Sequence, residues 1–382
     1  MGSLRRGRDV VLLAVLIVVV AIPLLVAVVV LHHPRWYPMS DDSLTESHVR
    51  EVGTRNPPLT GLGGRIGEPG PNTGSHPGPL SFWSLAIFYR LLGAGSWALH
   101  AGTAALNIIA IGLTLWMTRR RGGPAVMIYG AAILIVLLTA YGTFALTLPW
   151  NPYLPILWWL VTMTAVWSLL CGDLPMLPVA VFAASFCVQT HISYLGIGSA
   201  AVGVGAAATA YWIHSRRGTD EFQPSLRWLA IGVGLGALVW FPPIAEQVTG
   251  SQGHNLSVIF HHFSDPPEEA LGLRSGADLL LAMMNPQMLL TDPVIEGRNF
   301  LSGPTEPGLV LVGVWTAAVV VAGWLRHWTL LRLHALLAVV LAAGLLSASR
   351  IFGPPFLYLT LWGWGITAFI LFAVGWTAAA GM

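Results

Sequence analysis

The sequence predicts an all-α polytopic membrane protein with about ten transmembrane helices and two long extracytoplasmic loops that carry interfacial helices. Of its 382 residues, 55% are hydrophobic and only 9% are charged, and the mean hydropathy is +0.70. This composition lies outside the soluble globular class. Many of the 17 tryptophans stand near the ends of apolar runs, as is typical of interfacial aromatic belts. We treat residues 1–382 as a single membrane domain.

Charge and cysteine content exclude several functions. The formal net charge is +2 and no dense basic run occurs, so we expect no nucleic-acid partner. The two cysteines, Cys171 and Cys187, lie inside apolar segments without ligand spacing, so neither a disulfide framework nor a zinc site is predicted.

The first span is predicted at Val10–Leu31, with a bend at Pro23. The run is long enough to cross a membrane and no small-residue cleavage site follows it, so we interpret it as an uncleaved helix. Arginines precede it, and Arg119-Arg120-Arg121 follow the second span. The positive-inside rule then places the N-terminus in the cytoplasm and residues 32–96 outside the plasma membrane.

Nine further spans follow from the remaining apolar runs. Residues 80–92 are too short to cross and predict an interfacial helix. A Pro242-Pro243 break is expected to end the seventh span, before a second outside loop at residues 245–307. The chain ends soon after the last span, so we expect no soluble C-terminal domain. The nine spans are expected near Trp97–Trp116, Ala125–Tyr141, Tyr153–Leu170, Met176–Gln189, Ile197–Trp212, Trp228–Ile244, Gly308–Trp324, Leu330–Leu346 and Phe356–Trp376.

The acidic residues gather in the two loops, which hold 13 of the 17. Asp41 and Asp42 are adjacent, so mutual repulsion favours a raised pKa and a role as a base. The alternative is a helix start, with Ser43 and Glu46 as a capping box. Glu46 and Arg50 share a helix face, either as a surface ion pair or as groups that face a substrate.

Three further residues are candidate substrate contacts. Arg65 precedes a Gly/Pro-rich turn that ends in His76-Pro77-Gly78-Pro79. His76 there is either structural or a phosphate or hydroxyl contact. Arg350, at the outer end of the ninth span, has no acidic neighbour in sequence, which indicates an anionic partner: a substrate's lipid phosphate or a membrane headgroup.

Other polar groups at the outer ends of spans are weaker candidates. Trp150-Asn151-Pro152, His191 and Ser193 are either lining for the same cavity or ordinary loop residues. A divalent cation is a candidate cofactor, since oxygen and nitrogen ligands occur in the second loop, although their spacing matches no established pattern. The ligands considered are His261, His262, Asp265, Asp292 and Glu296.

Taken together, the chain resembles the GT-C superfamily of membrane glycosyltransferases. It is most similar to the branch of protein mannosyltransferases, aminoarabinose transferases and actinobacterial arabinofuranosyltransferase-like proteins. The resemblance rests on Asp41-Asp42 soon after the first span, on Arg65-x-Gly67 followed by His76-Pro77-Gly78-Pro79, and on an interfacial helix before the second span. The alternation of spans and outside loops extends it over most of the chain.

The resemblance implies a glycosyltransferase that uses a polyprenyl-phosphate sugar donor and inverts the anomeric carbon. A first-loop aspartate, Asp42 or secondly Asp41, would be the general base on an acceptor hydroxyl of a glycan, lipid or protein. Arg350 would hold the donor phosphate, and Glu46, Arg50 and Arg65 would line the cleft. Two alternatives remain open: a transporter or flippase of a lipid-linked saccharide, and a non-catalytic subunit of a cell-envelope assembly.

Overall fold

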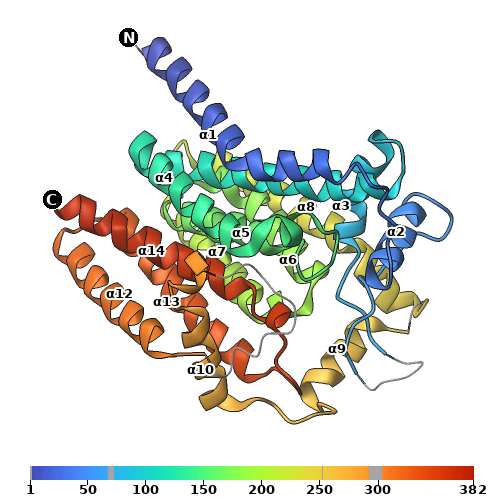
Figure 1. The fold of residues 1–382 in the computed structure, drawn as a ribbon. Coiled ribbons are helices and arrows are strands. Elements are labelled where there is room, and N and C mark those ends of the chain that lie inside the picture. The colour runs from blue at the N-terminus through green and yellow to red at the C-terminus, as the bar shows by residue number, and fades with distance from the viewer. Residues whose placement is uncertain (1, 68–72, 252, 292–302) are drawn as a thin grey trace.

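The computed structural model describes residues 2–67, 73–251, 253–291 and 303–382, and its elements are almost all helical (Figure 1). The α-helices are α1 Gly2–Val30, α2 Asp41–Glu51, α3 Leu80–Leu91, α4 Ser96–Thr147, α5 Ile156–Leu170, α6 Leu177–Thr190, α7 Leu195–Ser215, α8 Phe222–Thr249, α9 Asn255–Ser264, α10 Gly272–Met283, α11 Met288–Thr291, α12 Glu306–Trp324, α13 Trp328–Ser349 and α14 Trp362–Gly381. Short 3₁₀ turns are η1 Leu174–Met176, η2 Ile192–Tyr194 and η4 Leu357–Leu359.

Helix α4 contains two of the predicted spans, folded back on each other. Gly123 interrupts it with φ of 77°, a conformation that glycine adopts without a Cβ penalty, and Pro124 follows. The two arms then run antiparallel, since the Asn107 side-chain amide donates to the Leu146 carbonyl at 2.7 Å.

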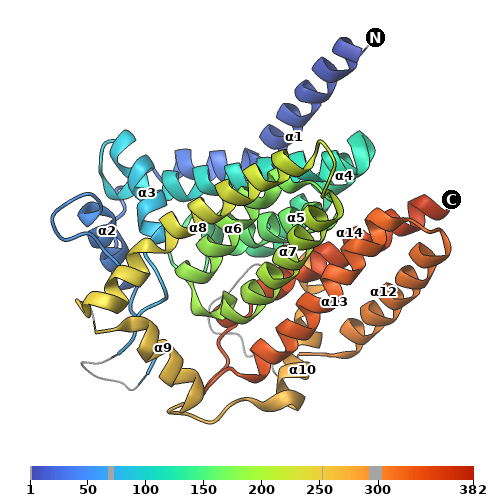
Figure 2. The same cartoon turned by 180° about the vertical axis from the view of Figure 1, so that it is seen from behind.

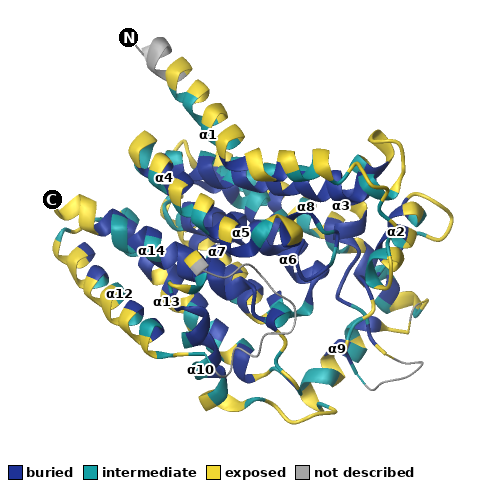
Figure 3. Ribbon diagram, in the orientation of Figure 1, coloured by how far each residue is buried: buried dark blue, intermediate teal, exposed yellow. Residues whose placement is uncertain are grey.

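The predicted polytopic helical fold is confirmed. Seven helices of the described chain, α4 among them, are long and apolar enough to cross a membrane, and α3, α5 and α6 are shorter apolar helices. With the arms of α4 taken separately, an apolar helix stands at each of the ten predicted span positions, and α3 stands where a short helix was predicted before the second span. Apolar side chains of α1 and α12 are exposed along much of their length (Figure 3), as expected of lipid-facing helices.

Helix α5 forms the centre of the bundle and is buried from Ile156 to Leu169. It is apolar all round, which is the pattern of a helix with no solvent face. Helices α4, α6 and α7 pack against it (Figures 1 and 2). Its 15 residues span about 22 Å at 1.5 Å per residue, so it is shorter than a membrane core.

Three local predictions are wrong. Helix α8 continues through Pro242 and Pro243 to Thr249. Pro243 cannot donate to the Val239 carbonyl, and the Gln189 side chain supplies that hydrogen bond instead at 2.9 Å. The last helix begins at Trp362 rather than Phe356, because residues 353–361 form a Gly-Pro-Pro bend and the 3₁₀ turn η4.

The third wrong prediction is the capping box at the start of α2. The helix does begin at the acidic pair, but Ser43 lies inside it, and its hydroxyl donates to the Ser40 carbonyl at 2.7 Å. Glu46 therefore does not cap the helix; its carboxylate binds side chains of α3 and α4.

The two long loops meet at one end of the bundle, which we call the loop end. Residues 61–66 and 74–76 pair as a short hairpin around an antiparallel bridge between Gly63 and Ser75. The backbone amide of Ser75 donates to the side-chain oxygen of Asn255 in α9 at 2.8 Å. The side-chain nitrogen of Asn255 donates to the Ser75 carbonyl at 3.0 Å. The first loop is thus fastened to the second.

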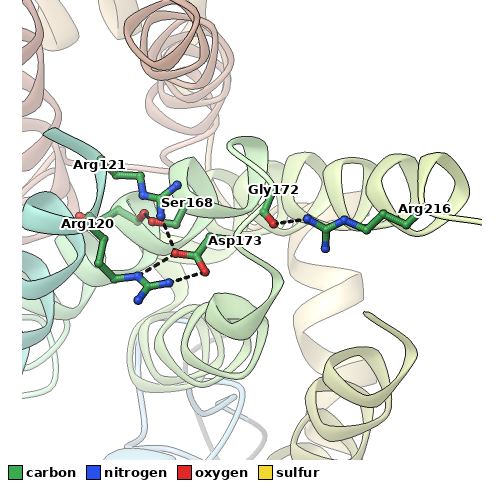
Figure 4. A network of polar contacts seen from close by, with 7 residues as sticks. Arg120, Arg121, Ser168, Gly172, Asp173 and Arg216 are labelled. Atoms are coloured by element: carbon green, nitrogen blue, oxygen red, sulfur yellow. Dashed lines mark hydrogen bonds and ion pairs between the residues drawn. The ribbon is translucent and has the colours of Figure 1, made fainter. Parts of the chain in front are cut away.

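The opposite end of the bundle carries the arginine clusters and is called the arginine end (Figures 1 and 4). Asp173, which is 9% exposed, accepts two hydrogen bonds from Arg120, at 2.7 and 2.8 Å, and one from Arg121 at 2.5 Å. Arg216 donates to the Gly172 carbonyl at 2.9 Å. These contacts join the turn of α4 and the α7–α8 connection to the α5–η1 connection.

Candidate functional site

The acidic pair stands at the first turn of α2, where the exposed amides favour negative charge. The Asp41 carboxylate accepts a hydrogen bond from the indole nitrogen of Trp150 at 2.8 Å. Oδ1 of Asp42 is buried. Trp150 belongs to the connection between α4 and α5, so a residue of the bundle fixes the direction of the first-loop carboxylate.

Trp150 is the first member of an aromatic cluster that also contains His191, Phe356 and Tyr358. The Trp150 and Tyr358 rings meet edge to face with centroids 5.3 Å apart. Tyr358 then meets His191 edge to face at 6.0 Å and stacks on Phe356 at 5.4 Å. Such offset and edge contacts are the geometries that aromatic rings favour. Three segments distant in sequence are thereby joined next to Asp41.

His76 is packed beneath this cluster and is buried. Its ring lies 4.5 Å from that of His191, and its Nδ1 accepts a hydrogen bond from the Ile192 amide at 3.0 Å. Burial lowers the pKa of His76 to about 3. The pKa of His191 is also lowered, first by burial and then by the repulsion that two protonated imidazoles would have at this distance. Both imidazoles are neutral at pH 7, so His76 fastens the hairpin to η2 and carries no cationic charge.

Arg65 reaches the other side of the cluster from the hairpin. Its guanidinium lies over the Phe356 ring, 5.2 Å from the centroid, a cation–π arrangement. One of its nitrogens is 3.3 Å from the Glu268 carboxylate, and both side chains are about half exposed. Arg65 is therefore joined to Asp41 through Phe356, Tyr358 and Trp150.

Arg350 lies at the seam between α9 and the segment after α13. Its guanidinium is 5.1 Å from the Phe352 ring centroid and donates to the Phe263 carbonyl at 2.5 Å. That carbonyl is in the last turn of α9, where a cation is favourable. Phe352 also meets the ring of His262, 5.1 Å away.

His262 connects Arg350's surroundings with those of Arg65. Its Nδ1 accepts a hydrogen bond from the Gly67 amide at 3.1 Å. Its pKa is lowered by burial and then by the positive charge of Arg65, while Glu268 opposes the shift. The two candidate arginines thus flank one small region of the loop end.

Glu46 and Arg50 form a separate brace between α2, α3 and α4. Glu46, only 5% exposed, accepts hydrogen bonds from Tyr89 at 2.7 Å, Ser96 at 2.8 Å and Arg50 at 2.5 Å. Burial raises the pKa of Glu46, but the hydrogen bonds from Tyr89, Ser96 and Arg50 outweigh it, and the net pKa is lowered. This buried carboxylate, with its partners on three helices, positions the helix that carries Asp41 and Asp42.

The metal candidates do not come together in the described part of the chain. No group of three or more His, Cys, Asp or Glu side chains suited to a metal ion occurs there. Nδ1 of His262 is engaged by the Gly67 amide, and His261 and Asp265 are exposed. Asp292 and Glu296 lie outside the described residues.

Sequence reasoning missed the partners that join the candidate residues. Tyr358 and Phe356 were expected within an ordinary membrane span, and Glu268 had no assigned role. The one local signal was the run Phe352-Gly-Pro-Pro-Phe356, which is a poor start for a helix.

No protein-family model and no curated protein matches the chain. Among solved structures, it is similar to ArnT from Cupriavidus metallidurans bound to undecaprenyl phosphate, with a TM-score of 0.54, 14% sequence identity and coverage of 95% of this chain. The apo form of the same ArnT aligns with a TM-score of 0.42 and 14% identity, over 98% of this chain and 77% of that one. The chain spans 60% of the length of the undecaprenyl-phosphate-bound ArnT. The comparison shows that the chain shares the fold of this ArnT structure over most of its length.

Proposed function

We propose, from the premise that this chain has the GT-C fold of ArnT, that it is a glycosyltransferase with a polyprenyl-phosphate sugar donor. One observation carries the proposal: the aromatic cluster joins a carboxylate pair at a helix start to an accessible arginine. A base and a phosphate-binding cation are the two charged groups that such a transfer requires. The solved ArnT is bound to undecaprenyl phosphate, which supports a polyprenyl phosphate as the ligand class here.

In the proposed reaction, the acceptor hydroxyl attacks the anomeric carbon from the face opposite the phosphate. Asp42 takes the hydroxyl proton, with Asp41 as the second candidate for this role. A new C–O bond forms to the acceptor oxygen, the bond between the anomeric carbon and the phosphate oxygen breaks, and polyprenyl phosphate leaves with that electron pair. The configuration at the anomeric carbon is inverted. Trp150 holds the Asp41 carboxylate in a fixed direction throughout.

The donor phosphate is proposed to bind at Arg65 and Arg350. Both guanidinium groups lie over phenylalanine rings and both are accessible. Arginine offers paired N–H donors that match phosphate oxygens. Glu46 and Arg50 contribute by holding α2 in place, and His76 contributes by holding the hairpin that carries Arg65.

The loop end is proposed to face the outside of the plasma membrane, with the N-terminus in the cytoplasm. The arginine end carries Arg119, Arg120 and Arg121 beside the turn of α4 and Arg216 and Arg217 after α7, and arginines at short cytoplasmic turns are typical of the inner side. The site would then meet a donor that enters laterally from the outer leaflet and an acceptor of the cell envelope.

The decisive experiment removes the proposed base. Detergent-purified protein is incubated with undecaprenyl-phosphate-linked mannose, aminoarabinose or arabinofuranose and a cell-envelope acceptor fraction, and released undecaprenyl phosphate is measured by mass spectrometry. We expect Asp42→Asn to lower release by about 10²-fold or more, the contribution typical of general base catalysis, and Asp41→Asn to lower it less.

Asp265→Asn is the matched control, because Asp265 is an exposed carboxylate of the same end. Tryptophan fluorescence during unfolding verifies that each variant folds. Full release by both Asp41→Asn and Asp42→Asn would refute the mechanism. Translocation of the donor in proteoliposomes without release of sugar would refute the enzyme and favour a flippase.

A further inference from the structure

The ion pair between Arg65 and Glu268 is the one charged contact seen between the two long loops in the described residues. It consists of a single approach of 3.3 Å between one guanidinium nitrogen and one carboxylate oxygen. The side chains are 47% and 49% exposed. A pair of this kind is weak, since water competes for both partners and the paired donors of arginine are used only once.

Arg65 is held in position independently of Glu268. Its guanidinium rests on Phe356, and the next residues are fastened to α9 through the Gly67–His262 hydrogen bond. If the Glu268 carboxylate left, the guanidinium would remain in place with its nitrogens accessible.

Glu268 is free to leave, because its backbone is anchored by neighbours rather than by its carboxylate. The Glu269 carbonyl accepts from the Gly353 amide at 3.2 Å, and the Leu271 amide donates to the Ile351 carbonyl at 2.9 Å. The carboxylate itself lies against Gly353, where a Cβ atom would be 1.5 Å from Oε2 of Glu268 and 3.0 Å from the Arg65 guanidinium. This space beside the arginine exists because residue 353 has no side chain.

We propose that Arg65 is a binding site for a polyprenyl phosphate monoester and that Glu268 is an exchangeable internal anion in the place of the phosphate. The inference rests on the proposed function for the identity of the lipid. A phosphate that enters beside Gly353 displaces the Glu268 carboxylate into water and takes two guanidinium donors where the carboxylate took one. The opposite exchange, in which Glu268 returns to Arg65, favours release of the product phosphate.

The test compares binding of undecaprenyl phosphate to the full chain in detergent, measured by native mass spectrometry, for wild type, Glu268→Gln and Arg65→Gln. Removal of a competing exposed ion pair predicts that Glu268→Gln binds about two- to fivefold more tightly. Arg65→Gln should bind more weakly, and the double variant should bind as Arg65→Gln does. Undecaprenol, which has no phosphate, should bind equally to all of them.

Glu269→Gln is the matched control, because it removes one charge at the adjacent exposed position and should leave the affinity unchanged. The proposal is overturned if Glu268→Gln binds undecaprenyl phosphate no more tightly than wild type, or if Glu269→Gln gives the same gain. A gain seen only with phosphatidylglycerol would also overturn it, because the site would then bind membrane headgroups. These binding measurements require no sugar transfer. A negative result here is therefore distinct from a negative result in the Asp42 experiment, which measures release of undecaprenyl phosphate.

Discussion

The buried carboxylate of Glu46 offers a direct test of what positions the acidic pair. Glu46→Gln keeps the size of the side chain but removes the charge that accepts from Tyr89, Ser96 and Arg50. Hydrogen bonds to a charged group contribute about 1 kcal/mol more than neutral ones, and the Arg50 contact is discounted because Arg50 is 62% exposed. We therefore expect Glu46→Gln to lower the free energy of unfolding by about 1–3 kcal/mol.

The measurement is unfolding in mixed micelles titrated with sodium dodecyl sulfate and followed by tryptophan fluorescence. Glu51→Gln is the matched control. It lies on the same helix, but its side chain is 46% exposed and its ion pair is with His48, so a change within about 0.5 kcal/mol is expected. An equal loss of unfolding free energy in Glu46→Gln and Glu51→Gln would refute the proposal that Glu46 braces α2 against α3 and α4. Release of undecaprenyl phosphate should fall with Glu46→Gln, since α2 carries Asp41 and Asp42.

The same carboxylate predicts a pH window. The pKa of Glu46 is lowered in the folded protein, so the unfolded chain binds its proton first as the pH falls. The stabilisation from Glu46 is therefore complete above pH 4.5 and is lost as the pH falls through the folded pKa. The difference between wild type and Glu46→Gln should be the same at pH 7 and pH 5.5, and should shrink below pH 4.5.

Two further predictions concern other parts of the molecule. Asp173→Asn should lower the free energy of unfolding by about 2–4 kcal/mol, less than for a fully buried pair because Arg120 is 38% exposed. Asp9→Asn should lower it clearly less, because the Asp9 carboxylate is 30% exposed and pairs with one arginine. Equal losses in the two variants would contradict this reasoning. His76 must be neutral in the folded state, with a pKa of about 3. Stability should therefore fall by up to about 1.4 kcal/mol per pH unit below pH 6.5. The pH dependence from 6.5 to 5 should be shallower in His76→Gln, and parallel curves would contradict this.

The positions of the membrane helices could be predicted because each depends on local composition. An apolar run bounded by Arg119–Arg121 or Arg216 identifies a span without knowledge of its neighbours. Helix ends next to proline could not be predicted in the same way. Whether a helix continues through Pro242-Pro243 depends on a remote donor, and here Gln189 satisfies the carbonyl of Val239.

In the candidate site, too, the residue types could be predicted from local sequence, whereas their contacts depend on tertiary structure. The carboxylates at 41 and 42, Arg65 and His76 could be named from one loop, because reactive residue types are rare in this chain. Their partners could not, since Trp150 is 109 residues from Asp41 and Glu268 is 203 residues from Arg65. A tryptophan near the end of a span predicts an interfacial anchor equally well, and only tertiary structure shows that its indole donates to a carboxylate.

Arg65 and Arg350 differ in what a phosphate would have to displace. Arg350 donates to a backbone carbonyl at the C-terminal end of α9, so an anion bound there competes with the capping of a helix. Arg65 is paired with a half-exposed side chain that can be solvated when it leaves. The sequence favoured Arg350 because it has no acidic neighbour along the chain, whereas the structure gives it a partner 87 residues away. Displacement of the internal partner costs less free energy at Arg65, so the first contact with the donor phosphate is expected there. Contact with Arg350 is expected second, because its guanidinium also holds α9 against the segment after α13.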